Sequence, residues 1–272
     1  MPFHGIRAPL GRDDLVTRCR AYKLRMRDDA AFTSLTAAVL WGMPVPAAAD
    51  LSRLRVSVPH GRPRPRSRGV VGTERSLDVE VVESRGLRVL APADAWASLA
   101  SELGVGELIA IGDYLVDPRH GLPRTGIDAL AAVAARRRPG APSLRRALPR
   151  IRLGSRSRTE SLVRVLLTES GVPEPSLNHP LPEAGVFLDL AWPAAKFGLE
   201  YQGGHHVSPE QHAADIRRQE RVHDRGWLLM EITKFDLFDR PRAMVERVRS
   251  RLAERGIPSR AVHPPIWALP QR

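Results

Sequence analysis

Residues 186–206 read VFLDLAWPAAKFGLEYQGGHH, and this stretch decides the fold of the C-terminal half. VFLDLA is a short apolar run typical of strands, WPAA interrupts it, and KFGLEYQ alternates apolar and polar residues. The pattern predicts two strands joined by a turn. Alternation places Glu200 and Gln202 on one face of the second strand, and a hairpin brings Asp189 beside that face.

Carboxylates that face each other repel, and burying them without a cation is costly. Mg²⁺ offsets that cost, because it takes one or two protein carboxylates and leaves room for water and phosphate oxygens. Asp189 and Glu200 are therefore candidate metal ligands and catalytic residues for phosphodiester hydrolysis. The alternative is that both are solvated charges on a half-exposed hairpin, and the hairpin alone favours this alternative.

The segments around the hairpin carry further landmarks. Upstream, SRTES contains Glu160 near the start of an expected amphipathic helix. Downstream, DIRRQ contains Asp215 and Arg218, and GWLLMEIT reads as an apolar strand at the core of a sheet. Over about residues 155–255 this order resembles the DUF559 family, relatives of the very-short-patch-repair (Vsr-like) endonucleases in the PD-(D/E)xK nuclease superfamily.

The resemblance implies a restriction-endonuclease-like mixed sheet flanked by helices. It also implies a DNA endonuclease that depends on Mg²⁺ or Mn²⁺. In that interpretation Asp189 and Glu200 hold the metal, and Glu160 supports them as an outer catalytic residue. Asp215 and Arg218 brace the site; alternatively, they simply pair with each other across three residues of one helix.

Gln202 departs from the family, which usually reads E-x-D-G where this chain reads EYQG at residues 200–203. An amide oxygen can bind a metal or position water, but it is a weaker ligand for a hard cation. Gln202 therefore remains a candidate catalytic residue, and two functions stay open. One is an active endonuclease. The other is a nuclease-fold protein that has lost catalysis and acts as a DNA-binding regulator, in one version antitoxin-like.

His205 and His206 follow the second strand directly. Adjacent residues on an extended chain point to opposite faces, so one of the two at most serves the site. A neutral imidazole there would orient or deprotonate the attacking water. A polar loop pair is the alternative, and the sequence leaves both histidines as candidates.

The chain has 272 residues, a net charge of +12 and one cysteine, Cys19. This length allows two modest domains, and we expect an α+β protein with domains at 1–150 and 151–272. A lone cysteine excludes internal disulfides and fits a reducing cytoplasm. There is neither an apolar run of about 18 residues nor a secretion signal, so we expect a cytoplasmic protein without a membrane partner.

The positive charge is nearly all arginine, with three lysines, and favours a polyanion such as DNA. Two arginine-rich segments stand out, the loop at 61–69 and the segment at 136–158. A solvated loop and a charged linker are the alternatives, and arginine richness also follows from a GC-rich genome. The candidate contacts to DNA phosphates are Arg62, Arg64, Arg66, Arg145, Arg146, Arg152, Arg156 and Arg158.

The N-terminal half mixes helices and strands, with a helix expected at 31–46 and a strand at 51–60. Further strands are expected within 70–92, followed by a helix that Asp94 would cap. The order TSLTAAVLWGMP, V-x-VP, RGV, GLRVLAPADAWASLA resembles the C-terminal part of AbiEi-type antitoxins. Their repressing winged helix is not identifiable here, so that role does not carry over. A toxin partner and a homodimer are further partners to test.

Overall fold

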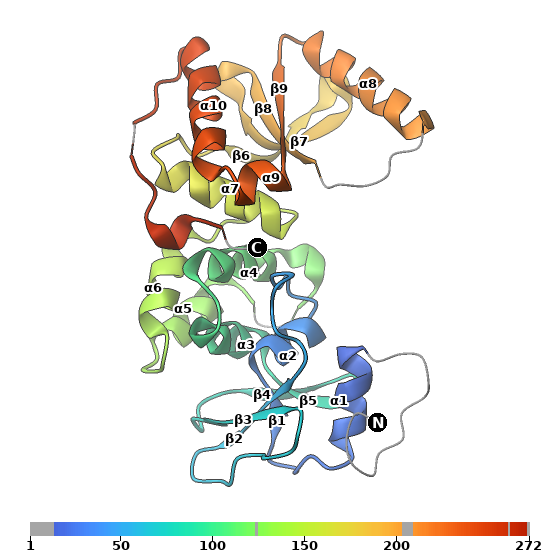
Figure 1. The fold of residues 1–272 in the computed structure, drawn as a ribbon, viewed down its shortest axis with the longest axis vertical. Coiled ribbons are helices and arrows are strands. Elements are labelled where there is room, and N and C mark those ends of the chain that lie inside the picture. Colours follow the sequence, from blue (N-terminus) through green and yellow to red (C-terminus); the bar gives the residue numbers. More distant parts are fainter. Residues whose placement is uncertain (1–13, 123–124, 203–208, 261, 271–272) are drawn as a thin grey trace. The chain divides into compact units, whose positions relative to one another are not determined.

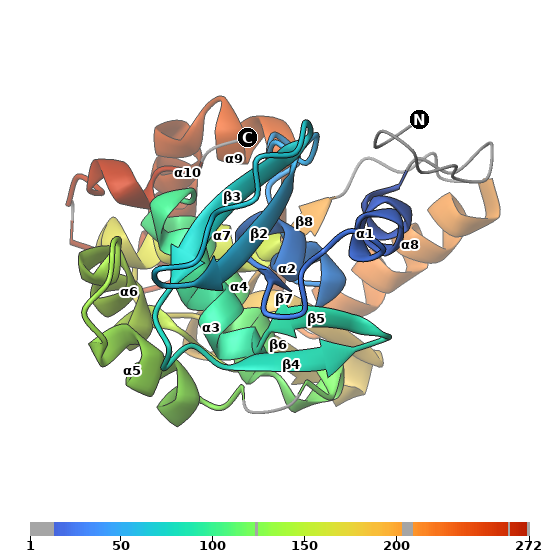
Figure 2. The same ribbon diagram turned by 90° about the horizontal axis from the view of Figure 1, so that it is seen from below.

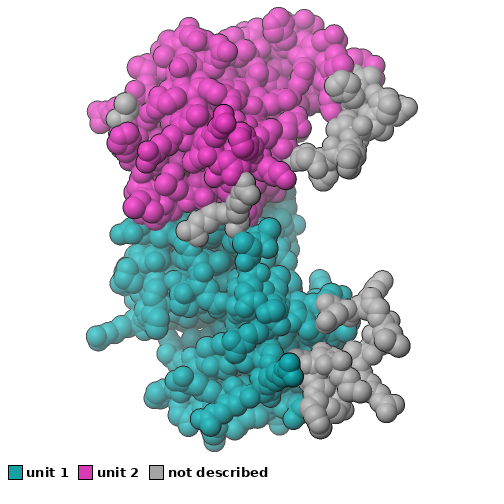
Figure 3. Space-filling model, viewed as in Figure 1, with its two compact units in different colours: residues 1–151 teal, residues 152–272 magenta. Residues whose placement is uncertain are grey.

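The computed structural model divides into two compact units, residues 1–151 and 152–272 (Figure 3). Each unit has its own mixed sheet and its own helices, so the expected mixed α/β class with two sheets is confirmed. The residues that the structure describes are 14–122, 125–202, 209–260 and 262–270.

The sheet of unit 1 has five strands in the order β3-β2-β1-β5-β4. β2 pairs with β3 and β1 with β5 in parallel, and the other pairs are antiparallel. β2 and β3 run side by side in both ribbon views (Figures 1 and 2). The strands are β1 Ala31–Phe32, β2 Leu54–Pro59, β3 Val70–Arg75, β4 Val81–Ser84 and β5 Leu87–Leu90.

The helices of unit 1 pack around Trp96, which is fully buried and donates its indole N–H to the Leu108 carbonyl oxygen at 2.8 Å. One expectation is wrong here. Asp94 does not cap its helix, because the N-cap is Ala91 and Asp94 lies buried in the first turn. The helices are α1 Leu15–Lys23, α2 Ser34–Leu40, α3 Pro92–Ser98, α4 Val105–Val116, α5 Ile127–Ala135 and α6 Ala141–Ala147.

The arginine-rich segment 136–158 was expected to be linker apart from a short helix at 143–151. It contains α6, whose Ala141, Leu144 and Ala147 are buried in unit 1. The apolar spacing of three residues puts these side chains on one helical face, and the arginines cover the other face. The short helix expected there is confirmed.

The sheet of unit 2 has four strands in the order β6-β7-β8-β9. The first three are antiparallel, and β9 runs parallel to β8 after a crossover through α8 (Figure 1). The strands are β6 Ser176–Leu181, β7 Val186–Trp192, β8 Phe197–Gln202 and β9 Leu228–Thr233. The helices are α7 Arg158–Glu169, α8 Pro209–His223, α9 Lys234–Phe238 and α10 Pro241–Glu254.

The hairpin expected within 186–206 is confirmed as β7 and β8. The strand β9 was expected at the core of the sheet, but it forms an edge of the four described strands. The other edge, β6, lies in a stretch that the sequence suggested was only a lead-in to the hairpin. Its Pro180 has no N–H to donate, which is tolerated on an edge strand.

Helix α7 packs on this sheet through Leu162, Val163 and Leu166, which are buried in one cluster with Leu190 and Leu199 of the hairpin. These contacts bring the first turn of α7 near β7, as the predicted amphipathic stripe requires. The first turn carries Glu160, which is thereby placed against the sheet.

Ser157 caps α7, because its Oγ accepts the Glu160 N–H at 3.1 Å. We expect Ser157→Ala to lower the free energy of unfolding by about 1 kcal/mol, since the N–H loses its partner. Urea denaturation of the full chain measures this effect. The matched control is Ser250→Ala on the exposed side of α10, which should be neutral or slightly stabilising. Equal midpoints for the two variants would contradict the capping role.

Candidate active site

The predicted carboxylate pair lies where the hairpin strands meet. Leu190 pairs with Leu199, and continuing this antiparallel register by one residue sets Asp189 opposite Glu200. The Tyr201 N–H donates to Asp189 Oδ2 at 3.0 Å and fixes that carboxylate. Glu200 is only 5% exposed. The structure therefore brings together the two residues that the sequence selected first.

Glu160 joins this pair from α7. It is 6% exposed, and its Oε2 accepts the backbone N–H of Arg156 at 2.8 Å. Asn178 of β6 donates to the same oxygen at 3.3 Å. Asn178 was not selected from the sequence, because the strand that carries it was not predicted. Two structural elements thus hold Glu160 in place beside Asp189.

Burial is the main cause that raises the pKa of Asp189, of Glu200 and of Glu160 above their ordinary values. The charge of Asp189 raises the pKa of each of the other two carboxyls further. The Tyr201 N–H opposes the rise at Asp189. The three carboxylates therefore form one coupled set that is short of compensating positive charge.

Arg218 supplies part of that charge. Its Nη1 donates to Glu200 Oε2 at 2.6 Å, its Nη2 donates to Glu200 Oε1, and Nη2 also donates to the Phe187 carbonyl oxygen at 3.1 Å. The bond to Glu200 is the main cause that raises the pKa of Arg218. The pKa of Glu200 is nevertheless raised, because burial outweighs the arginine. The ion pair of Arg218 is thus with Glu200, whereas Asp215 is exposed and only adds its charge nearby.

Gln202 lies at the exposed end of β8, where its Nε2 donates to Glu231 Oε1 at 3.1 Å. Gln219 of α8 donates to the same oxygen. The parallel register sets Glu231 beside Glu200, and the Glu231 charge contributes to raising the Glu200 pKa. The sequence offered Glu231 either as an extra charge for the site or as a solvent-facing residue, with the second favoured. The structure shows it exposed, and the register of β9 also sets it beside Glu200.

His205 and His206 lie at positions 203–208, outside the described residues. The role expected for one of them stays a prediction.

Three arginines predicted to contact DNA lie in unit 2. The guanidinium of Arg156 stands 4.8 Å from the centre of the Phe187 ring, and its charge lowers the pKa of Asp189. Arg158 lies 5.8 Å from the centre of the Phe238 ring. Arg152 pairs with Glu174 at 2.8 Å. Of these three arginines, Arg156 is therefore the one whose charge acts on Asp189.

The other predicted contacts lie in unit 1. Arg62 pairs with Asp29 at 3.6 Å, and Arg64 pairs with Glu74 at 2.9 Å. Exposed pairs of this kind leave the guanidinium accessible to a phosphate. The remaining three are exposed: Arg66 in the loop, and Arg145 and Arg146 on α6.

No group of three histidine, cysteine or acidic side chains gathers at metal-binding spacing among the residues that the structure describes. Asp189 and Glu200 together nevertheless fit Mg²⁺, which binds one or two carboxylates and keeps several waters. Arg218 donates to both oxygens of Glu200, so a cation bound there would share or compete for the lone pairs of this carboxylate.

Asp189→Asn should stabilise the protein at neutral pH, because burial disfavours the carboxylate. The pKa of Asp189 in the folded protein lies above the ordinary value of 3.8, so the folded state binds this proton more tightly than the unfolded state does. The wild-type protein therefore loses stability as the pH rises from about 3.8 through the folded-state pKa. We expect a melting temperature about 2–4 °C above wild type at pH 7, the shift that roughly 1 kcal/mol produces, and equal melting temperatures near pH 4. Melting curves across this pH range test the sign. A destabilised variant at pH 7 would contradict it.

Within the described part of the chain, no helix is long and apolar enough to cross a bilayer.

No family model matches this chain. Uncharacterized proteins from two strains of Mycobacterium tuberculosis are each 26% identical to it over 245 residues, which cover 88% of this chain and 87% of each relative. No solved structure matches it significantly. A shared stretch of this length exceeds either unit, so the relatives share parts of both.

Proposed function

We propose that unit 2 is a metal-dependent DNA endonuclease of the Vsr-like PD-(D/E)xK type. The observation that carries the proposal is the pair Asp189 and Glu200, which stand opposite each other on β7 and β8 with raised pKa values; Glu200 is buried and Asp189 is partly buried. Such a pair is unfavourable without a cation, and active sites are where such arrangements concentrate. Glu160 adds a third carboxylate from the preceding helix.

The architecture of unit 2 supports this assignment. A helix precedes three antiparallel strands, and a second helix leads to a parallel fourth strand. This order gives the mixed sheet flanked by helices that the resemblance implies. It also explains why residues far apart in sequence converge, since α7 delivers Glu160 and α8 delivers Arg218 to the same hairpin.

In the proposed mechanism, Asp189 and Glu200 hold Mg²⁺ or Mn²⁺. When bound, the ion polarises the scissile phosphate and lowers the pKa of the attacking water. The Tyr201 N–H keeps Asp189 oriented. Arg218, once released from Glu200, donates to a phosphate oxygen, for which its planar fork is suited. His205 or His206 takes the proton from the water.

Substrate binding in this proposal rests on arginine. Arg156 and Arg158 lie at the start of α7 and would contact phosphates on either side of the scissile bond. The net charge of +12 favours the same substrate.

A second function has its own supporting observation. Arg218 pairs with Glu200, and the Gln202 amide donates to Glu231, so both side chains have protein partners that would compete with a metal. This favours a DNA-binding regulator that keeps the nuclease fold without catalysis. A toxin partner or a homodimer would belong to this second function.

The deciding experiment incubates the full chain with labelled single-stranded, duplex, mismatched and branched DNA. Each substrate is tested with Mg²⁺, with Mn²⁺ and with a chelator. Cleavage that requires metal supports the endonuclease. DNA binding without cleavage supports the regulator, and the absence of both binding and cleavage overturns the two proposals together.

A further inference from the structure

Unit 1 contains a cavity of about 310 Å³ between its sheet and its helices. This volume lies at the small end of the range for small-molecule sites, roughly 300–1,000 Å³. Its lining includes Thr73 and Arg75 of β3, Ser98 of α3, and Arg138 from the loop between α5 and α6. Charged and hydroxyl side chains from separate elements therefore converge on one space.

Arg75 is half-buried and lacks an ion pair among the described residues. Its Nη1 donates to the Ser57 carbonyl oxygen at 2.6 Å, and its Nη2 donates to the Asp29 carbonyl oxygen at 2.7 Å. Both acceptors are neutral. Burial and the nearby charge of Arg88 lower the pKa of Arg75, and the charge of Asp29 opposes this shift in part.

Arg138 is a second lining arginine whose charge is only partly balanced. The buried carboxylate of Asp94 is shared by two guanidiniums, because Oδ1 lies 2.8 Å from Arg136 Nη1 and 3.9 Å from Arg138 Nη1. Asp94 Oδ2 accepts the Glu80 N–H at 3.1 Å. The side chain of Arg138 is 18% exposed, and burial is the main cause that lowers its pKa. Arg138 is therefore desolvated and holds only a long contact to a carboxylate.

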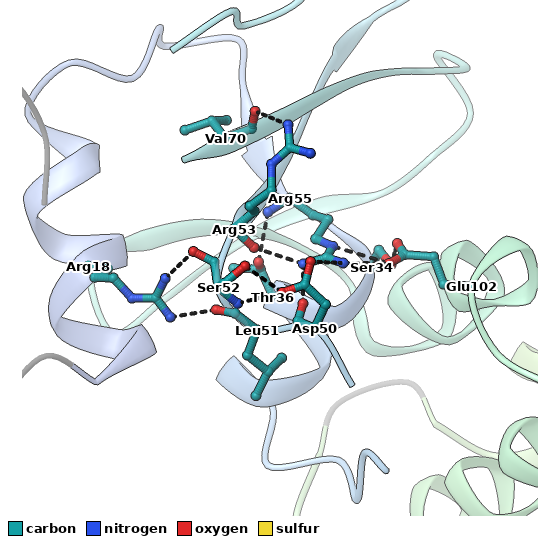
Figure 4. A network of polar contacts seen from close by, with 10 residues as sticks. All are labelled: Arg18, Ser34, Thr36, Asp50, Leu51, Ser52, Arg53, Arg55, Val70 and Glu102. Carbon is teal, nitrogen blue, oxygen red and sulfur yellow. Dashed lines mark hydrogen bonds and ion pairs between the residues drawn. The ribbon is translucent and has the colours of Figure 1, made fainter. Parts of the chain in front are cut away.

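A third arginine in the lining behaves differently. Arg55 and Glu102 point toward each other in Figure 4, where Arg55 Nε donates to Glu102 Oε2 at 3.1 Å and Ser34 donates to Oε1. Arg55 Nη1 also donates to the Arg53 carbonyl oxygen at 2.9 Å. Arg55 and Glu102 therefore have their partners within the protein, and we assign them a structural role. Arg75 and Arg138, in contrast, have no carboxylate at hydrogen-bond distance among the described residues.

We propose that this cavity binds a small phosphorylated molecule, a sugar phosphate or a nucleoside monophosphate. Arg138 presents a guanidinium fork that suits a phosphate, and the N–H groups of Arg75 that the two carbonyls do not hold add further donors. Thr73 and Asp78 offer partners for sugar hydroxyls, and Val71 contributes an apolar surface for the ring. The proposal concerns unit 1 and does not rest on the endonuclease.

Isothermal titration calorimetry on the full chain tests it, with ribose 5-phosphate, adenosine 5′-monophosphate, inorganic phosphate and ribose as probes. We expect saturable binding of the two organic phosphates, weaker binding of inorganic phosphate, and no binding of ribose. Arg75→Gln and Arg138→Gln should each weaken the organic phosphates by about tenfold or more, because each removes a charged hydrogen bond. Arg138→Lys, which keeps the charge but not the fork, should weaken them less.

Arg68→Gln is the matched control, because Arg68 is exposed and lies outside the lining, and it should bind like wild type. Thermal melting of each variant confirms that unit 1 is folded. Wild-type protein that binds no organic phosphate would overturn the proposal, as would equal weakening by Arg68→Gln and Arg75→Gln. Inorganic phosphate binding as tightly as the organic phosphates would exclude sugar recognition.

Discussion

Asp189→Asn is expected to reduce Mg²⁺-dependent DNA cleavage by about 10²–10³-fold or more, with affinity for DNA changed less than about twofold. The expected loss is large because an amide carries no negative charge to hold a hard cation. Without the cation, the charge that develops on the phosphate during the reaction is not stabilised. DNA affinity should persist because the arginines supply it. Single-turnover cleavage and a separate binding assay in chelator measure the two quantities.

Asp224→Asn is the matched control, since Asp224 is exposed beyond the end of α8 and undergoes the same chemical change. It should cleave like wild type. Because Asp189→Asn is also expected to melt higher at pH 7, unfolding cannot account for its lost activity. Full cleavage by Asp189→Asn would overturn the proposed mechanism.

Arg218→Gln is expected to lower the free energy of unfolding in metal-free buffer by about 2–3 kcal/mol. Removing one partner of a fully buried ion pair costs about 3–5 kcal/mol, and the 29% exposure of Arg218 reduces that figure. Glu200 remains buried without its cation, so added Mg²⁺ should stabilise this variant more than wild type. Urea denaturation with and without Mg²⁺ measures both effects.

Arg217→Gln serves as the control, because Arg217 is the exposed neighbour on α8. It should change stability by less than about 0.5 kcal/mol. The double variant Arg218→Gln with Glu200→Gln should lose much less than the sum of the single variants, since neither charge is left alone. If the loss in the double variant equalled the sum of the two single losses, the interaction between Arg218 and Glu200 would contribute nothing to stability.

Local patterns in the sequence predicted much of unit 2. Alternation in KFGLEYQ and the break at WPAA gave the hairpin, and the apolar stripe gave α7. The strand β6 was missed because Pro180 and its polar neighbours do not alternate in a way that predicts a strand. In unit 1, the short helix expected at 143–151 is confirmed by α6 and the turn that follows it.

In the candidate site, too, local patterns predicted some of the residues and missed others. The hairpin pattern together with the flanking landmarks was enough to select Asp189 and Glu200. The partner of Arg218 could not be predicted, because helical spacing suggested Asp215 three residues away, whereas tertiary packing of α8 on the sheet sets it against Glu200. Glu231 and Asn178 depend on strand register, which local patterns do not determine.

The proline in β6 also bears on self-association. Many sheets join a second copy by pairing edge strands, and this contact needs a continuous row of backbone donors. Pro180 interrupts that row at one border of the four-stranded sheet, and the charged side chain of Glu231 lies on the opposite border strand. Edge-to-edge fibre growth through unit 2 is thereby discouraged. A dimer of this protein would accordingly form through side-chain surfaces rather than through a continuous intermolecular sheet.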